Sequence, residues 1–230
     1  KVQIVYGIFA AYSNMVVVKK ESPIQSYVDL KGKKFGNYGG PAASMTQLCM
    51  IIAKKWYDMD MLKDVKMITA PTGALRGLLD KGDIDAALMT TTELARMLPT
   101  GEYRVILVPG DEWNKRVGRP PLYVMMTTNE EYTAAHPRTA RDFIRAYIDT
   151  SNYVKAHPEL WSDFAKSVGI TDPGEVKQLR ILIEDEMVVS WDQKQIEAQM
   201  KFLEYGMEVL GETFLKKLPD PEFMTARYVP

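Results

Sequence analysis

The chain of 230 residues has little of what marks several protein classes. It contains one cysteine and two histidines, and none of its apolar runs approaches the roughly 18 residues of a membrane-spanning helix. A disulfide within the chain is therefore impossible, and a His/Cys metal site is disfavoured. Its 29 basic and 30 acidic residues are well mixed and leave a net charge of −1. This balance argues against nucleic acid as a partner and against direct membrane insertion.

Catalytic motifs are also missing. The sequence has no GxSxG, P-loop or GxGxxG pattern. Cys49 lies within an apolar helical run and is expected to be a buried small hydrophobe, and His136 and His157 each precede a proline, as residues at helix boundaries do. The acidic run at 184–186 is expected to be a solvated helix end. We therefore predict no catalytic residue, no metal and no cofactor.

The chain divides into two halves of different character. From about residue 15 to 128, apolar runs such as MVVVKK, VKMIT, IDAALM, RVILV and LYVMMTT alternate with short helical patterns. This order predicts an α/β layer with a mixed or parallel sheet. After Asn129 the chain reads as successive helices punctuated by Pro and Gly. These helices need an apolar surface to cover, which we expect either from strands upstream of Lys1, absent from this chain, or from another subunit.

The stretch KKFGNYGGPAASM predicts a strand, a tight turn and a helix. Gly36, Gly39 and Gly40 allow positive φ and leave no side chain between the backbone and a ligand, and Pro41 suits a first helical position. The helix is expected from Ala42 to about residue 56, and its first N–H groups would lie at the carboxyl edge of a sheet. A carboxylate, sulfonate or ring carbonyl would dock there. A plain β-to-α connection explains the same glycines.

Two further segments contribute candidate ligand contacts. A run of three threonines follows the strand IDAAL, although one of them is explained by helix capping, and the segment AAYSN precedes the first strand of the α/β region. Simple strand-edge polarity accounts equally well for the latter, and an exposed loop tyrosine is common. The complete set of candidate ligand-binding residues is Tyr12, Ser13, Asn14, Asn37, Tyr38, Gly39, Gly40, Ala42, Ser44, Met89, Thr90, Thr91 and Thr92.

Four blocks of the sequence resemble a known family in the right order. They are SPIQSYVDLKGKKFGNYGGPAASM, ALRGLLDKGDIDAALMTTTELARML, LYVMMTTNEEYTAAHPRTARDFIRAYIDTSNYVKAHPELW and LPDPEFMTARYV. They are similar to the NMT1/THI5-like periplasmic substrate-binding proteins of ABC importers, which take aliphatic sulfonates, taurine, nitrate or thiamine precursors. The resemblance covers nearly all of the chain but only about the last two thirds of a family member. Relatives often place a hydroxyl residue directly after the glycine, whereas here the first is Ser44, which favours a weaker acid, an amide or a heterocycle.

The resemblance implies an α/β type II periplasmic-binding-protein fold of two lobes joined by two crossing strands, with lobe one incomplete. Lobe one would comprise residues 1–14 and 127–230, and lobe two residues 15–126; NMVVVKK and PLYVMMTT would be the crossings. The implied function is capture of a sulfonate, carboxylate or pyrimidine-like solute in an interlobe cleft and delivery to an ABC permease, in the periplasm or another extracytoplasmic space, with no signal peptide in this chain. An enzyme on the same fold, acting on a pyrimidine precursor or chorismate-like acid, and a ligand-sensing domain of a regulator remain alternatives.

Overall fold

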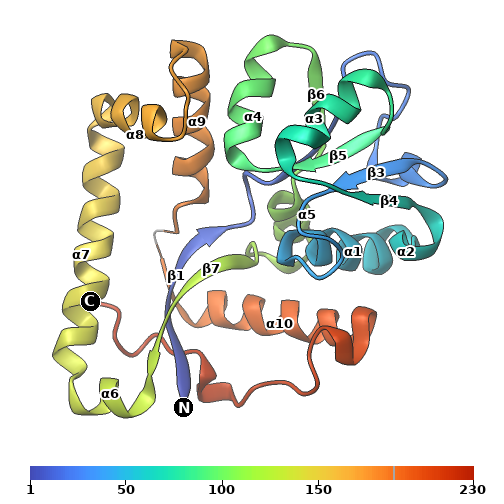
Figure 1. The fold of residues 1–230 in the computed structure, drawn as a ribbon. Coiled ribbons are helices and arrows are strands. Elements are labelled where there is room, and N and C mark those ends of the chain that lie inside the picture. The colour runs from blue at the N-terminus through green and yellow to red at the C-terminus, as the bar shows by residue number, and fades with distance from the viewer. Residues whose placement is uncertain (189) are drawn as a thin grey trace.

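The computed structural model describes residues 1–188 and 190–230, which form two sheets surrounded by helices (Figure 1). Within these residues the strands are β1 (Val2–Ala10), β2 (Met15–Lys19), β3 (Lys34–Asn37), β4 (Lys66–Thr69), β5 (Ala86–Met89), β6 (Tyr103–Leu107) and β7 (Leu122–Asn129). The helices are α1 (Ser44–Tyr57), α2 (Met61–Asp64), α3 (Thr72–Lys81), α4 (Thr91–Met97), α5 (Pro109–Val117), α6 (Glu130–Ala135), α7 (Pro137–Ala156), α8 (Trp161–Ser167), α9 (Pro173–Glu186) and α10 (Gln193–Leu210), with short 3₁₀ turns between them. The predicted α/β region and the helical second half are both confirmed.

The larger sheet brings three chain segments to a common edge. Its order is β4-β3-β5-β2-β6, with β3 parallel to both β4 and β5, while β2 runs antiparallel to β5 and β6. The carboxyl ends of β3 and β5 therefore lie at the same edge as the start of β2, and Met15 pairs directly with Met89. The residues after β3, after β5 and before β2 consequently meet.

The turn after β3 is shaped by two glycines. Gly39 and Gly40 have φ of +71° and +76°, a left-handed conformation that costs other residues energy. Helix α1 begins at Ser44. Pro41 therefore lies in the turn, whereas the sequence predicted it at the first helical position. The spacing of Met45, Leu48, Cys49, Ile52 and Trp56 predicts an apolar face on this helix; the first four residues are buried in the core, and Trp56 is partly buried against it.

The smaller sheet pairs β1 with β7 antiparallel, from Val2 opposite Asn129 to Ala10 opposite Leu122. Single bridges from Ile4 to Met224 and from Phe9 to Met187 extend it on the other side of β1. The chain passes between the two sheets twice, as expected. The passages lie at residues 11–14 and 118–121, directly before β2 and β7, because β2 belongs wholly to the larger sheet and β7 pairs along its length with β1.

Helices of the second half rest on both sheets (Figure 1). α9 packs on α4 and places Leu179 and Leu182 in the core on that side of the larger sheet. α10 packs on α1 and also meets α5, where the Trp113 ring of α5 contacts Phe202 of α10 edge-on at a centroid distance of 5.7 Å, a contact of about 0.5–1.5 kcal/mol beyond its buried area. α7 contributes Ile144 to the core of the smaller sheet. Because contacts cross residue 126/127 so widely, the division into lobes at that point stays a prediction.

α7 and α8 leave several large apolar side chains exposed, among them Phe143 at 65% and Phe164 at 45%. This exposure agrees with the expectation that these helices need a further surface to cover. None of the helices within residues 1–188 and 190–230 is both long enough and apolar enough to cross a membrane.

Candidate ligand-binding site

A pocket of about 380 Å³ opens at the edge of the larger sheet where the three segments meet. It is lined by Asn14, Tyr38, Ala43, Ser44, Met45, Thr90, Thr91, Thr92 and Tyr123. Six of these were candidates from the sequence, and they come from the three segments that the strand order brings together. The volume lies at the lower end of the usual range for small-molecule sites.

One wall of the pocket is the start of α1. Ala43 is the N-cap residue and provides no side-chain hydrogen bond, and the first intrahelical bond runs from the amide of Gln47 to the carbonyl of Ala43. The amides of Ser44 and Met45 precede that bond, so they are among the N–H groups that a helix leaves without an internal partner. This wall therefore offers donors to a bound molecule.

The opposite wall is the threonine segment at the start of α4. Thr90 is the N-cap of α4 without capping through its side chain, so the capping explanation does not account for its hydroxyl. The hydroxyls of Thr90 and Thr92 lie 3.4 Å apart. The hydroxyl of Thr91 instead turns inward, 3.1 Å from Ser13 Oγ and 3.2 Å from the Ser13 carbonyl oxygen.

The remaining candidates lie away from the pocket. Met89 is fully buried in the core, and Asn37 is fully buried between β3 and β4, where it donates to the Ile68 carbonyl and accepts from Thr69. Ser13 is buried behind Thr91, and Tyr12 packs with the core of the smaller sheet. Gly39 and Gly40 form the turn that leads to α1 without lining the cavity. These residues position the pocket and do not face its interior.

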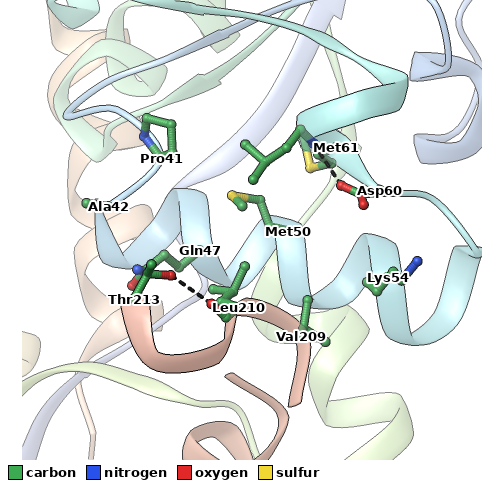
Figure 2. Close-up of a pocket in the computed structure, with 11 residues that line it drawn as sticks. Pro41, Ala42, Gln47, Met50, Lys54, Asp60, Met61, Val209, Leu210 and Thr213 are labelled. Carbon is green, nitrogen blue, oxygen red and sulfur yellow. Dashed lines mark hydrogen bonds between the residues drawn. The ribbon is translucent and has the colours of Figure 1, made fainter. Parts of the chain in front are cut away.

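Ala42 lines a second cavity of about 380 Å³ between α1, α2 and the end of α10 (Figure 2). Its floor is apolar, with Met50, Met61 and Leu210. The only charged side chains at its rim are Lys54 and Asp60, among the residues described. Neighbouring residues of one turn therefore face two different cavities, and no pattern in the sequence separates them.

A buried carboxyl lies directly behind the polar pocket. Glu186, the last residue of α9, is 3% exposed. Its Oε1 accepts hydrogen bonds from the hydroxyls of Tyr123 at 2.8 Å and Thr91 at 3.1 Å, and from Asn14 Nδ2 at 3.5 Å. The hydroxyl of Tyr38 donates in turn to Asn14 Oδ1. Glu186 thus joins four residues of the pocket's inner side, directly or through one partner.

Burial raises the pKa of Glu186 from 4.5 to about 7, although the hydrogen bonds from Tyr123 and Thr91 oppose the shift. Burial also raises the pKa values of Tyr38 and Tyr123 above the ordinary value, so both rings stay protonated. Glu186 is therefore the group in this cluster that titrates near neutral pH. A carboxyl of perturbed pKa beside a cavity is typical of functional sites.

The prediction that the acidic run at 184–186 is a solvated helix end is wrong for Glu186. The signal that it is buried was present in the spacing, because Glu186 follows Leu182 by four residues and Leu179 by seven, and so continues the apolar stripe of α9. Tyr123 was missed as well, because it lies in the apolar run LYVMMTT, which predicted only a strand.

Groups suited to other chemistry lie elsewhere. Burial raises the pKa of the Cys49 thiol to about 12, which makes it unreactive. His136 and His157 cap helices at the surface, as expected. No group of His, Cys, Asp or Glu within residues 1–188 and 190–230 has the geometry to hold a metal ion.

The sequence model of the family described as NMT1/THI5 like matches residues 1–160. No curated protein matches the chain.

Several solved structures share the fold. The alkanesulfonate-binding protein SsuA from Xanthomonas axonopodis pv. citri, bound to MOPS, is 15% identical with a TM-score of 0.70, over 99% of this chain and 73% of that one. The periplasmic aliphatic sulphonate-binding protein SsuA from Escherichia coli is 15% identical with a TM-score of 0.76, over 96% and 68%. A mutant of DSZB in complex with biphenyl-2-sulfinic acid is 13% identical with a TM-score of 0.65, over 99% and 78%. At such identities these likenesses establish the fold alone.

Proposed function

The chain belongs to the NMT1/THI5-like family, and we propose that it is an extracytoplasmic solute-binding protein that captures a small polar organic molecule. Its fold is the type II periplasmic-binding-protein fold. The observation that carries the proposal is the pocket at the larger sheet's edge, where Asn14, Tyr38 and Thr90 converge from three segments far apart in sequence. Pockets at such sheet edges are the usual ligand sites of α/β folds.

The arrangement also suits capture by closure. Tyr123 lies in β7 of the smaller sheet and reaches the same pocket as Thr90 of the larger sheet. Residues 11–14 and 118–121 connect the two sheets. Changes of φ and ψ in these two segments would move one sheet relative to the other. Movement about them would open the pocket for entry and exclude water once a ligand is bound. Periplasmic location and delivery to an ABC permease belong to this proposal through the family.

A thermal-shift screen tests the proposal. The compounds are aliphatic and aromatic sulfonates, carboxylates and amino-heterocycles, and a ligand at 100 times its Kd raises the free energy of unfolding by about 2.7 kcal/mol. Two variants of one turn show which cavity binds. Ser44→Trp places a large side chain in the polar pocket, and Ala42→Trp places the same side chain in the groove of Figure 2.

We expect Ser44→Trp to abolish the ligand-induced rise in melting temperature and Ala42→Trp to retain it. The reverse result would assign capture to the apolar groove. The desulfurization enzyme DSZB shares this fold, and Glu186, with its pKa of about 7, is the group here that has a suitable pKa for acid–base chemistry. Chemical analysis of each compound that stabilises the protein, after prolonged incubation, separates the two functions: unchanged compound supports capture, and turnover supports an enzyme.

A further inference from the structure

The hydroxyl protons of Tyr38, Thr91 and Tyr123 all have acceptors within the protein. Tyr123 has one hydroxyl proton, and Glu186 Oε1 takes it at 2.8 Å. Tyr38 gives its proton to Asn14 Oδ1. Thr91 has two acceptors within reach, the Ser13 carbonyl at 3.2 Å and Glu186 at 3.1 Å, and both are buried. Toward a bound molecule, the hydroxyls of Tyr38 and Tyr123 therefore present only lone pairs, while the hydroxyl of Thr91 faces inward.

The pocket has no positive side chain to balance an anion. Of the residues that the structure describes, those lining the cavity include no Lys, Arg or His. No basic side chain within residues 1–188 and 190–230 hydrogen-bonds to Glu186 or pairs with it. The start of α1 supplies two amides and a partial positive charge, enough to hold one acceptor atom but not to neutralise a full anion beside a buried carboxylate.

We propose that this pocket selects organic molecules that present N–H donors to Tyr38 and Tyr123, above all cationic amines and amidines, and that it rejects sulfonates and carboxylates whose charge faces those residues. The inference rests on the proposed function and names the ligand class of the same site. On this side of the pocket a donor group finds two oriented acceptors and the field of Glu186, whereas an anionic oxygen meets lone pairs and a like charge.

Glu186 acts here as a positioning residue, because it orients the hydroxyls and supplies the charge without lining the cavity. Its protonation near neutral pH removes that charge and turns it into a donor. The groups that face it are Tyr123 from β7, Thr91 from α4, and Asn14 and Ser13 from the segment before β2, with Tyr38 one partner further away. Both tyrosines stay neutral in this range, so the affinity for a cation should follow Glu186.

The test uses matched probes that differ only in the head group. Benzamidine, benzamide, benzoate and benzenesulfonate share one ring, and butylamine, butyramide, butyrate and butanesulfonate repeat the comparison without it. Binding to the whole chain is measured by calorimetry and by ligand-observed NMR, which detects millimolar affinity, at pH 6 and pH 8. The variants are Glu186→Gln, which keeps the side chain's shape, and Asp185→Asn, which makes the same charge change at the neighbouring, more accessible position.

We expect benzamidine or butylamine to bind the wild type at pH 8 at least tenfold more tightly than its sulfonate and carboxylate partners. Glu186→Gln should weaken the cation about tenfold and make its affinity the same at pH 6 and pH 8, whereas Asp185→Asn should behave as the wild type. Tighter binding of the anions would overturn the inference and leave the proposed function intact. Cation binding that is insensitive to Glu186→Gln would overturn the role of Glu186. Failure of every probe would reject capture of small polar solutes, and the inference with it.

Discussion

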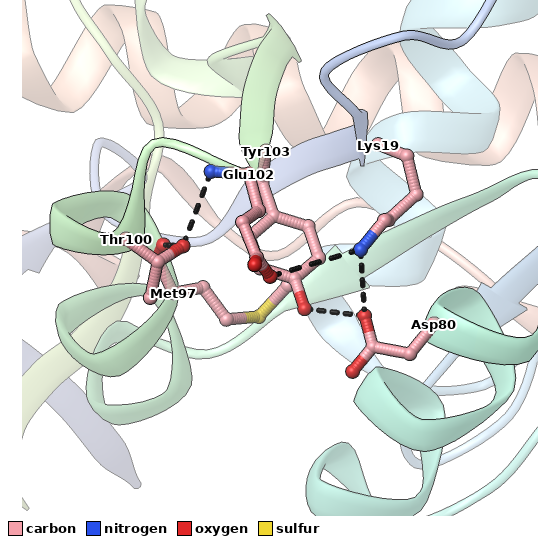
Figure 3. Close-up of polar contacts among 6 residues, drawn as sticks. All are labelled: Lys19, Asp80, Met97, Thr100, Glu102 and Tyr103. Carbon is pink, nitrogen blue, oxygen red and sulfur yellow. Dashed lines mark hydrogen bonds and ion pairs between the residues drawn. The ribbon is translucent and has the colours of Figure 1, made fainter.

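Two clusters near opposite ends of β2 pair a tyrosine hydroxyl with a carboxylate, and they behave in opposite ways. Near the N-terminal end of β2, the hydroxyl of Tyr123 donates to the carboxylate of Glu186. At its last residue, Tyr103 donates to Asp80, and Lys19 donates to the same oxygen at 3.2 Å (Figure 3). Burial raises the pKa of Glu186 to about 7, whereas the pKa of Asp80 lies below its usual value, because the hydrogen bonds from Tyr103 and Lys19 outweigh its slight burial.

The difference follows from a cation and from exposure. The Asp80 side chain is 40% exposed, and Lys19 lies between it and Glu102 while its ammonium sits 4.7 Å from the centre of the Tyr103 ring. Glu186 is 3% exposed, and its hydrogen-bond partners are neutral. Neutral donors alone do not offset the cost of burying a charge. The Asp80 cluster therefore stabilises the packing of α3 on the larger sheet. The Glu186 cluster keeps a buried carboxylate at a cost in stability, which is typical of functional sites.

The largest effect is expected from neutralising each carboxylate in turn. Folding raises the pKa of Glu186 from 4.5 to about 7. The contribution of this group to the free energy of unfolding is therefore fully present below pH 4.5 and is lost as the pH rises through about 7. Glu186→Gln should therefore raise the free energy of unfolding at pH 8 by up to about 3 kcal/mol and change it little at pH 5. Asp80→Asn should have the opposite sign, a loss of less than about 1 kcal/mol that is present at pH 8 and disappears as the pH falls through the lowered pKa of Asp80.

Urea unfolding at pH 5 and pH 8, followed by the fluorescence of the four tryptophans, measures both changes. Asp185→Asn, at the more accessible position beside Glu186, serves as the control for net charge. A loss of stability in Glu186→Gln at pH 8 would show that the hydrogen bonds from Tyr123 and Thr91 outweigh burial, and the contrast between the two clusters would disappear.

Removing each tyrosine hydroxyl should have a smaller and unequal effect. Tyr123→Phe takes a donor from a buried carboxylate, which costs about 1.5–3 kcal/mol at pH 8 and less at pH 5, where Glu186 is already protonated. It should also raise the pKa of Glu186 further. Tyr103→Phe takes a donor from a carboxylate that water and Lys19 still reach, at a cost of about 0.5–1 kcal/mol. Equal losses in the two variants at pH 8 would mean that burial does not distinguish the clusters.

Much of the fold was predictable because its signals are local. Short apolar runs mark β2, β4, β5 and β6, the glycines at 39 and 40 mark a left-handed turn, and the apolar spacing marks α1. Convergence of Asn14, Tyr38 and Thr90 followed from an α/β order in which strand ends share an edge. The start of α1 was placed two residues early, because the turn through Pro41 uses more residues than the pattern reveals.

The inner half of the candidate site was not predictable in this way. Glu186 and Tyr123 lie in elements whose position depends on how α9 and β7 pack against the larger sheet, and no local pattern encodes that packing. An acid next to two other acids is also usually solvated, so composition favoured the wrong environment for Glu186. The sequence also did not indicate which of two neighbouring residues faces the cavity: Met89 is buried in the core, while Thr90, the next residue, lines the pocket.

The smallest effect is expected at the cation of the exposed cluster. Lys19→Met keeps the aliphatic length of the side chain and removes its ion pairs with Asp80 at 3.2 Å and with Glu102 at 3.8 Å. Exposed pairs are worth a few tenths of a kcal/mol and are screened by salt, so the difference from the wild type should shrink further in 1 M NaCl. The pKa of Asp80 should rise toward its ordinary value, which NMR titration of the carboxyl measures, because one of the two donors that lower it is gone. If the pKa of Asp80 instead stayed low in Lys19→Met, the hydroxyl of Tyr103 and the charge of Arg76 would account for it, and Lys19 would not be the cation that makes the two tyrosine–carboxylate pairs differ.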